Sequence, residues 1–156
     1  MARIYALPIA GLTALTAVPF AQLATPATVS IQIVGIELGQ ETSETSQQEI
    51  VTLIHRSTAS TLPTATTPIP LFMRATAIAS LLTGSTTTNA TGIATVTGTA
   101  VDTLQLPPFN VLNGFIWYPP SDMRVSLAPS RFLTLQFKTA PAANTWSGAI
   151  YFIELN

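Results

Sequence analysis

Short runs in which apolar and polar residues alternate recur along this sequence, and they constrain its fold more than any other feature. In one run Val29, Ile31 and Ile33 share a face of an extended strand, and Gly35 then breaks the phase as a β-bulge does. Apolar residues nowhere recur at helical spacing over three turns, and the nearest candidate, residues 71–82, predicts one or two turns. The alternation therefore predicts an all-β chain.

The rest of the chain repeats this pattern. Further strands are predicted at 49–56, 115–118, 123–127, 133–138 and 146–155. Stretches rich in Thr, Pro, Gly and Asn separate the strands, and residues 140–145 fit a hairpin turn before the last one. That last strand is apolar on both faces, so we expect it in the centre of the core or covered by another subunit. This organisation predicts one antiparallel β-sandwich or jelly-roll domain over residues 1–156.

The first 24 residues allow two interpretations. Arg3 precedes an apolar run that ends near Ala24, which is the outline of a secretory signal peptide. However, Pro8 and Pro19 interrupt the run, and the β-branched residues between them suit strands better than an apolar helix. We therefore expect residues 1–24 to form N-terminal strands or an arm. An exported surface β-domain with a cleaved signal peptide is the alternative.

Charged residues are scarce, at 8% of the chain with a net charge of −1, whereas soluble proteins average about 25%. This balance offers no electrostatic footprint for nucleic acid or an anionic membrane, and no apolar stretch reaches the roughly 18 residues of a membrane-spanning helix. A surface with so few charges suits a protein that partners largely cover. The absence of Cys excludes disulfides, thiol catalysis and cysteine metal sites.

The sequence contains no residue pattern typical of a catalytic or metal site. His55, the single histidine, lies on the inward phase of an apolar strand and is interpreted as a core or interface residue. Glu41 and Glu44 lack the Asp, Asn and Gly spacing of a calcium loop, and residues 83–92 lack the Lys of a phosphate loop. Carboxylates that any small domain can pair for glycoside hydrolysis are Glu37, Glu49, Asp102 and Asp122. We expect no enzyme activity, catalytic residue, metal ion or cofactor.

Four aromatic residues near the C-terminus form the candidate site: Trp117, Tyr118, Trp146 and Tyr151. An exposed group of this kind would suit a sugar-binding platform. Large aromatic side chains also pack cores and subunit contacts, which is the interpretation that we favour. The four residues are accordingly predicted to lie at a subunit or capsid interface.

Two parts of the sequence resemble a family of small proteins from tailed bacteriophages. In the first part a strand leads into an acidic loop rich in Gln, Ser and Glu, then into a strand ending near Arg56 and a loop rich in Pro and Thr. The second part, residues 109–155, has an aromatic motif, an Arg-containing strand, two proline turns and a closing Ser-Gly strand. The residues of these later motifs are Trp117, Pro119, Pro129, Arg131, Ala140, Pro141, Ser147, Gly148 and Glu154.

The resemblance implies a capsid decoration (cement) protein, a β-sandwich that binds the outside of an icosahedral head and bridges neighbouring capsid subunits. It implies the major capsid protein as partner, a homo-oligomer that is typically a trimer, and the outer surface of the virion as location. The low charge of these strands departs from the family pattern, so its interface details are not transferred. A tail, neck or fibre-associated virion protein that contacts host glycans is a further alternative.

Overall fold

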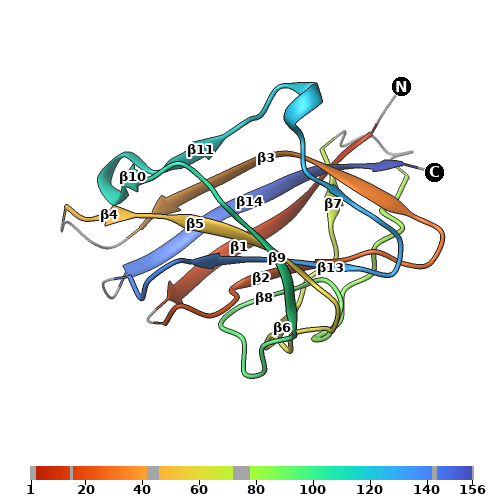
Figure 1. Cartoon of the computed structure of the whole chain (residues 1–156), viewed down its shortest axis with the longest axis horizontal. Coiled ribbons are helices and arrows are strands. Elements are labelled where there is room, and N and C mark those ends of the chain that lie inside the picture. The colour runs from red at the N-terminus through yellow and green to blue at the C-terminus, as the bar shows by residue number, and fades with distance from the viewer. Residues whose placement is uncertain (1–2, 15, 42–45, 72–77, 142–143, 156) are drawn as a thin grey trace.

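The computed structural model describes residues 3–14, 16–41, 46–71, 78–141 and 144–155. Two six-stranded antiparallel sheets pack face to face, which confirms the predicted all-β sandwich (Figure 1). The described helical elements are single 3-10 turns of three residues, so neither has the length that crossing a membrane requires.

The first sheet has the strand order β11-β3-β14-β1-β7, and β12 also pairs with β3. Its strands are β1 (Ile4–Ala14), β3 (Ser30–Gln40), β7 (Ile69–Pro70), β11 (Phe115–Trp117), β12 (Ser126–Leu127) and β14 (Asn144–Leu155).

The second sheet has the order β6-β8-β2-β13-β5-β9. Its strands are β2 (Ala21–Ala24), β5 (Val51–Arg56), β6 (Thr64–Ala65), β8 (Ala90–Thr91), β9 (Ala100–Gln105) and β13 (Phe132–Phe137). The remaining elements are the ribbon of β4 (Gln48–Glu49) with β10 (Phe109–Asn110), and the 3-10 turns η1 (Val111–Asn113) and η2 (Ser121–Met123).

The N-terminal segment contains the strands β1 and β2. β1 lies beside β14, with Ile4 opposite Ile153, and β2 lies beside β13 in the other sheet. Tyr5, Leu7 and Ile9 alternate into the core. Because β14 lies between β1 and β3, its two apolar faces belong to a central strand.

The core fills the space between the sheets with large side chains. Trp146 and Phe152 of β14 are fully buried, as are Phe137 of β13 and Phe20. The Phe137 and Trp146 rings approach to 4.9 Å between centroids from opposite sheets. Aromatic contacts of this kind add to the free energy of burying the rings themselves.

The predicted bulge at Gly35 is confirmed. The register of β3 against β14 runs from Gly35 opposite Tyr151 to Ile33 opposite Phe152, which leaves one extra residue on β3. The bulge returns Ile36 to the core side, where it is fully buried.

Two predicted elements differ from the structure. The hairpin at 140–145 is wrong, because β13 and β14 belong to different sheets and the connection crosses the sandwich. The strand at 123–127 shortens to Ser126–Leu127, and the residues before it form η2. Met123 belongs to that turn, where its N–H donates to the carbonyl of Pro120 instead of to a neighbouring strand. Residues 72–77, half of the possible helical turn at 71–82, lie outside the described residues, and the described residues 71 and 78–82 are not helical.

Between β5 and β9, the described residues 57–71 and 78–99 form a long excursion, and buried polar side chains connect it to the second sheet. Gln22 of β2 accepts a hydrogen bond from Ser60 N (2.7 Å) and donates one to Thr88 O (2.8 Å). The buried Arg56 guanidinium donates to Thr134 Oγ1 (2.8 Å) and to the carbonyl of Gly98. These bonds supply the polar partners that buried amide and guanidinium groups require.

Candidate interaction surface

Trp146 is the one predicted interface residue that the structure places inside the sandwich. Its exposed fraction is 0%, and its ring contacts Phe137 and Phe109. As β14 is a central strand, the face that carries Trp146 points at the opposite sheet. The prediction that Trp146 lies at a subunit or capsid interface is therefore corrected to a core role within one chain.

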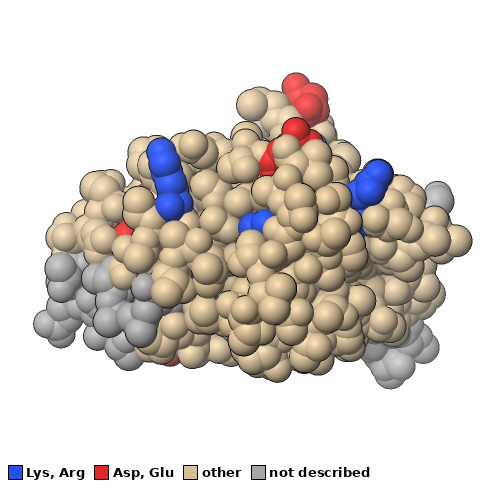
Figure 2. Space-filling view, turned by 60° about the horizontal axis from the view of Figure 1, so that its bottom comes forward, with Lys and Arg blue, Asp and Glu red and all other residues tan. Residues whose placement is uncertain are grey.

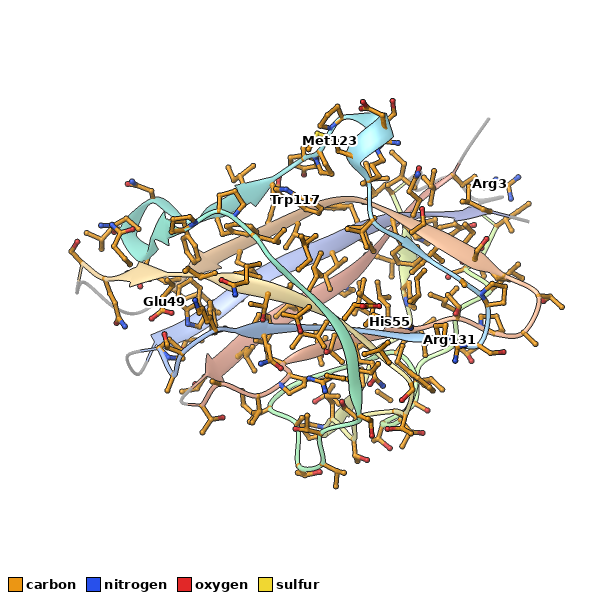
Figure 3. All side chains as sticks on the ribbon, viewed as in Figure 1. Arg3, Glu49, His55, Trp117, Met123 and Arg131 are labelled. Carbon is orange, nitrogen blue, oxygen red and sulfur yellow. The ribbon has the colours of Figure 1, made fainter. Side chains whose placement is uncertain are left out.

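Trp117 lies at the border between core and surface. It ends β11, which is the edge strand of the first sheet, and it packs against the core while staying partly exposed. Its neighbour Ile116 points away from the core and is 71% exposed. Figure 3 shows Trp117 and Met123 along the same upper edge of the molecule. The predicted alternation of Phe115 and Trp117 against Ile116 and Tyr118 is confirmed.

Tyr118 and Tyr151 form a stacked pair around Glu37. Their ring centroids lie 6.1 Å apart with an interplanar angle of 21°. Tyr118 OH donates to Glu37 Oε1 at 2.6 Å, and Tyr151 OH donates to Glu37 Oε2 at 3.1 Å. Sequence analysis considered Glu37 only as a possible catalytic carboxylate. The bulge at Gly35 shifts the alternation of β3, so that Ile36 and Leu38 face the core and Glu37 faces away from it. Glu37 then lies directly opposite Ala149 and diagonally opposite Tyr151.

This cluster keeps both phenols protonated. Partial burial raises the pKa of Tyr118 above its ordinary value, and the hydrogen bond to the Glu37 carboxylate raises it further. The pKa of Tyr151 is raised by the same two causes in the same order. Both carboxylate oxygens of Glu37 accept a phenol hydrogen bond, so the group holds the two rings in place rather than presenting a free base.

The edges of both sheets on this side of the molecule expose apolar side chains. In the first sheet β3 lies next to the edge strand β11, and in the second sheet β5 lies next to the edge strand β9. The chain runs from β3 through β4 to β5, so β9 and β11 border the same side of the sandwich. Six of the thirteen large apolar side chains that are exposed among the described residues belong to residues 100–123. We call them the apolar flank: Val101, Leu104, Leu112, Ile116, Tyr118 and Met123.

Charged groups are sparse on the surface. Figure 2 shows a face on which Lys, Arg, Asp and Glu form isolated spots in an uncharged background. Residues 100–123 contain Asp102 and Asp122 and no Lys or Arg. A surface of this composition can be desolvated at little electrostatic cost, because few charges lose their hydration.

The side chains with potential for chemistry belong to different elements, and His55 and Asp102 form one close pair. His55 Nδ1 lies 3.3 Å from Asp102 Oδ2 on neighbouring strands, and this Asp side chain is 81% exposed. Glu49 is buried beside the β4–β10 ribbon (Figure 3), and Asp122 lies on η2. Glu41 accepts a hydrogen bond from Ser147 Oγ, and the other residue of the weighed calcium loop, Glu44, lies outside the described residues.

Among the residues that the structure describes, no three His, Cys, Asp or Glu side chains converge in the manner of a metal site. The arrangement instead combines an ordered aromatic cluster with an apolar edge, which is suited to contact with another macromolecule.

The fold defines a β-sandwich protein with an apolar flank. No family model matches the chain, and no curated protein or solved structure matches it.

Proposed function

We propose that this protein is a capsid decoration (cement) protein, a structural virion component that binds the outside of an icosahedral phage head. In this role it bridges neighbouring copies of the major capsid protein and acts as a homo-oligomer, expected to be a trimer. The activity needs a rigid body with contact surfaces rather than a catalytic centre.

The observation that carries the proposal is the apolar flank. Its side chains belong to edge elements of a tightly packed sandwich, and Ile116 and Met123 are 71% and 68% exposed. Burial of such side chains against a capsid stabilises the complex by roughly 25 cal/mol per Å² of apolar surface removed from water. The resemblance described above, in the strand and turn motifs of residues 109–155, supports the same role.

Multivalency explains how modest contacts suffice. When one subunit of an oligomer binds a capsid subunit, it holds the other subunits of the oligomer close to their own binding sites. Their effective concentration at those sites is therefore raised. An oligomer then remains attached although each individual contact is weak. Outward movement of the capsid subunits under internal pressure has to break these contacts together.

The test is the copy number of this protein in purified virus particles, measured against the major capsid protein by quantitative mass spectrometry. We expect hundreds of copies per particle and the release of intact trimers under mild denaturation. Copies in the single digits or low tens would contradict decoration and assign the protein to the tail or neck. Absence from particles would overturn a virion role, and an intact mass lacking about 24 N-terminal residues would support the exported alternative.

A second candidate rests on the exposed tyrosine cluster. Tyr118 is 51% exposed and stacks on Tyr151, and exposed aromatic rings are typical contacts for sugar rings. A tail or fibre protein that contacts host glycans would use such a surface. Glycan-array binding that Tyr118→Ala abolishes would favour this candidate, whereas an array without signal would contradict it.

A further inference from the structure

β9 differs from the other edge strands of the sandwich. The edge strands β6, β7, β11 and β12 contain two or three residues each, whereas β9 contains six. All six residues of β9 are exposed, and none of the described strands pairs with its outer side. Short edge strands are a common protection against unwanted strand pairing, and β9 lacks this protection.

β1 also has a long free edge beyond its short pairing with β7, but that edge is interrupted. Pro8 offers no N–H group, and the register against β14 shifts between Ile9 and Leu12 around Gly11, whose φ is +57°. β9 contains neither Pro nor Gly. Its pairing with β5 leaves Val101 as an extra residue between Ala100 and Asp102 and is regular from Asp102 to Gln105. The backbone groups along the outer side of β9 are therefore suited to an added strand.

The charge of this edge indicates which strand it accepts. Asp102 projects from the middle of β9 with 81% of its side chain exposed, and His55 Nδ1 on the neighbouring strand lies 3.3 Å from Asp102 Oδ2. Asp122 is the other charged residue of 100–123. Two-fold pairing of β9 with a second copy, centred on Asp102, would place two carboxylates opposite each other, which is unfavourable. If the two-fold pairing is centred on Thr103 instead, Asp102 of one copy lies opposite Leu104 of the other copy.

We propose that β9 binds an extended segment of another protein by strand addition, and that this segment carries a Lys or Arg opposite Asp102. Leu104, which is 45% exposed, lies on the same face of β9 as Asp102 and provides an apolar contact beside the basic residue of the added strand. The basic residue pairs with Asp102 across the strands, while the backbone bonds supply most of the affinity. This inference stands independently of the proposed virion role.

The test uses two blocked heptapeptides that differ at the centre, Ser-Thr-Val-Lys-Val-Thr-Ser and the same peptide with Glu in place of Lys. Each is added at millimolar concentration to the ¹⁵N-labelled full chain, and the backbone amide shifts are followed by NMR. We expect the Lys peptide to shift the β9 amides and to bind about two- to fivefold more tightly than the Glu peptide. Asp102→Lys is expected to reverse this preference.

The matched control is Asp122→Lys, which makes the same charge change away from β9 and should leave the peptide preference intact. Equal binding of both peptides, or shifts outside β9 alone, would overturn the proposal. Sedimentation equilibrium without peptide provides a second check. A concentration-dependent dimer with protected β9 amides would assign this edge to a second copy instead. Neither result depends on whether the protein occurs in virus particles.

Discussion

At the scale of single residues, Glu49 is an acidic side chain whose buried surroundings disfavour its negative charge. It is 1% exposed, and its carboxylate accepts hydrogen bonds from two neutral groups, Gln47 Nε2 at 2.6 Å and Thr139 Oγ1 at 3.4 Å. Burial raises the pKa of Glu49 above its ordinary value, although the Thr139 hydrogen bond opposes the shift. The folded protein therefore binds this proton more tightly than the unfolded chain does.

Glu49→Gln is expected to stabilise the fold at pH 7. As pH rises, the unfolded chain loses the Glu49 proton first, so the wild type loses stability until the pH passes the raised pKa of the folded state. The Gln variant avoids this loss, because its amide oxygen can accept from Gln47 Nε2 while its NH2 group donates to Thr139 Oγ1. We expect a gain of about 1 kcal/mol in urea denaturation at neutral pH, and none below the ordinary glutamate pKa. The exposed Glu41→Gln is the control, and equal gains at both pH values would contradict the argument.

Trp146→Ala is expected to lower the free energy of unfolding by about 3–5 kcal/mol, because it leaves a large cavity between Phe109 and Phe137. Trp146→Phe keeps an aromatic ring at the position and should cost distinctly less. Denaturant unfolding followed by circular dichroism measures both variants. A loss below about 1 kcal/mol for the Ala variant would contradict full burial of this ring.

At the scale of elements, the connection from β11 to η2 is held against β3 by the close approach of Tyr118 to Gly35. A Cβ atom at position 35 would lie 2.2 Å from Tyr118 Cε1, so the ring rests where any larger residue would place its side chain. Tyr118 then reaches Glu37 and Tyr151. The glycine is required for this contact between the two elements.

Gly35→Ala should therefore displace the Tyr118 ring and break its bond to Glu37, at a cost of about 1–2 kcal/mol. In a Tyr118→Ala background the same change should be neutral or slightly stabilising, since Ala is less flexible than Gly in the unfolded chain. A double-mutant cycle by urea denaturation measures this coupling. Additive effects of the two substitutions would show that the ring and position 35 are independent.

The alternation of apolar and polar residues was sufficient to predict strands but not which distant segments pack against each other. It predicted the faces of β3 and β13 and the bulge at Gly35, because local sterics and burial determine them. It missed that the excursion between β5 and β9 covers the outer face of the second sheet, so that Thr52 and Thr134 are buried there. The hydrogen bond between Gln22 and Ser60 joins residues 38 positions apart, so no local sequence pattern predicts it. The Glu37 cluster was missed for the same reason.

At the scale of the whole molecule, the scarcity of charge and the position of the apolar flank belong together. The sandwich buries its apolar residues between the sheets, yet the edges bordered by β9 and β11 keep Ile116 and Met123 in solvent. Exposed apolar groups at this density cost solubility unless a partner covers them. The flank is thus the surface at which the whole protein is expected to meet its partner.

Ile116→Lys combined with Met123→Lys tests this expectation on purified particles. Both side chains are largely exposed, so the double variant should unfold within about 0.5 kcal/mol of the wild type. If the flank contacts the capsid, two desolvated ammonium groups should lower particle occupancy at least tenfold in a sedimentation assay. Val96→Lys, at a position 58% exposed on the excursion, is the matched control and should bind normally. Unchanged occupancy of the double variant would remove the flank from the contact surface, and loss of binding by the control alone would move that surface to the excursion.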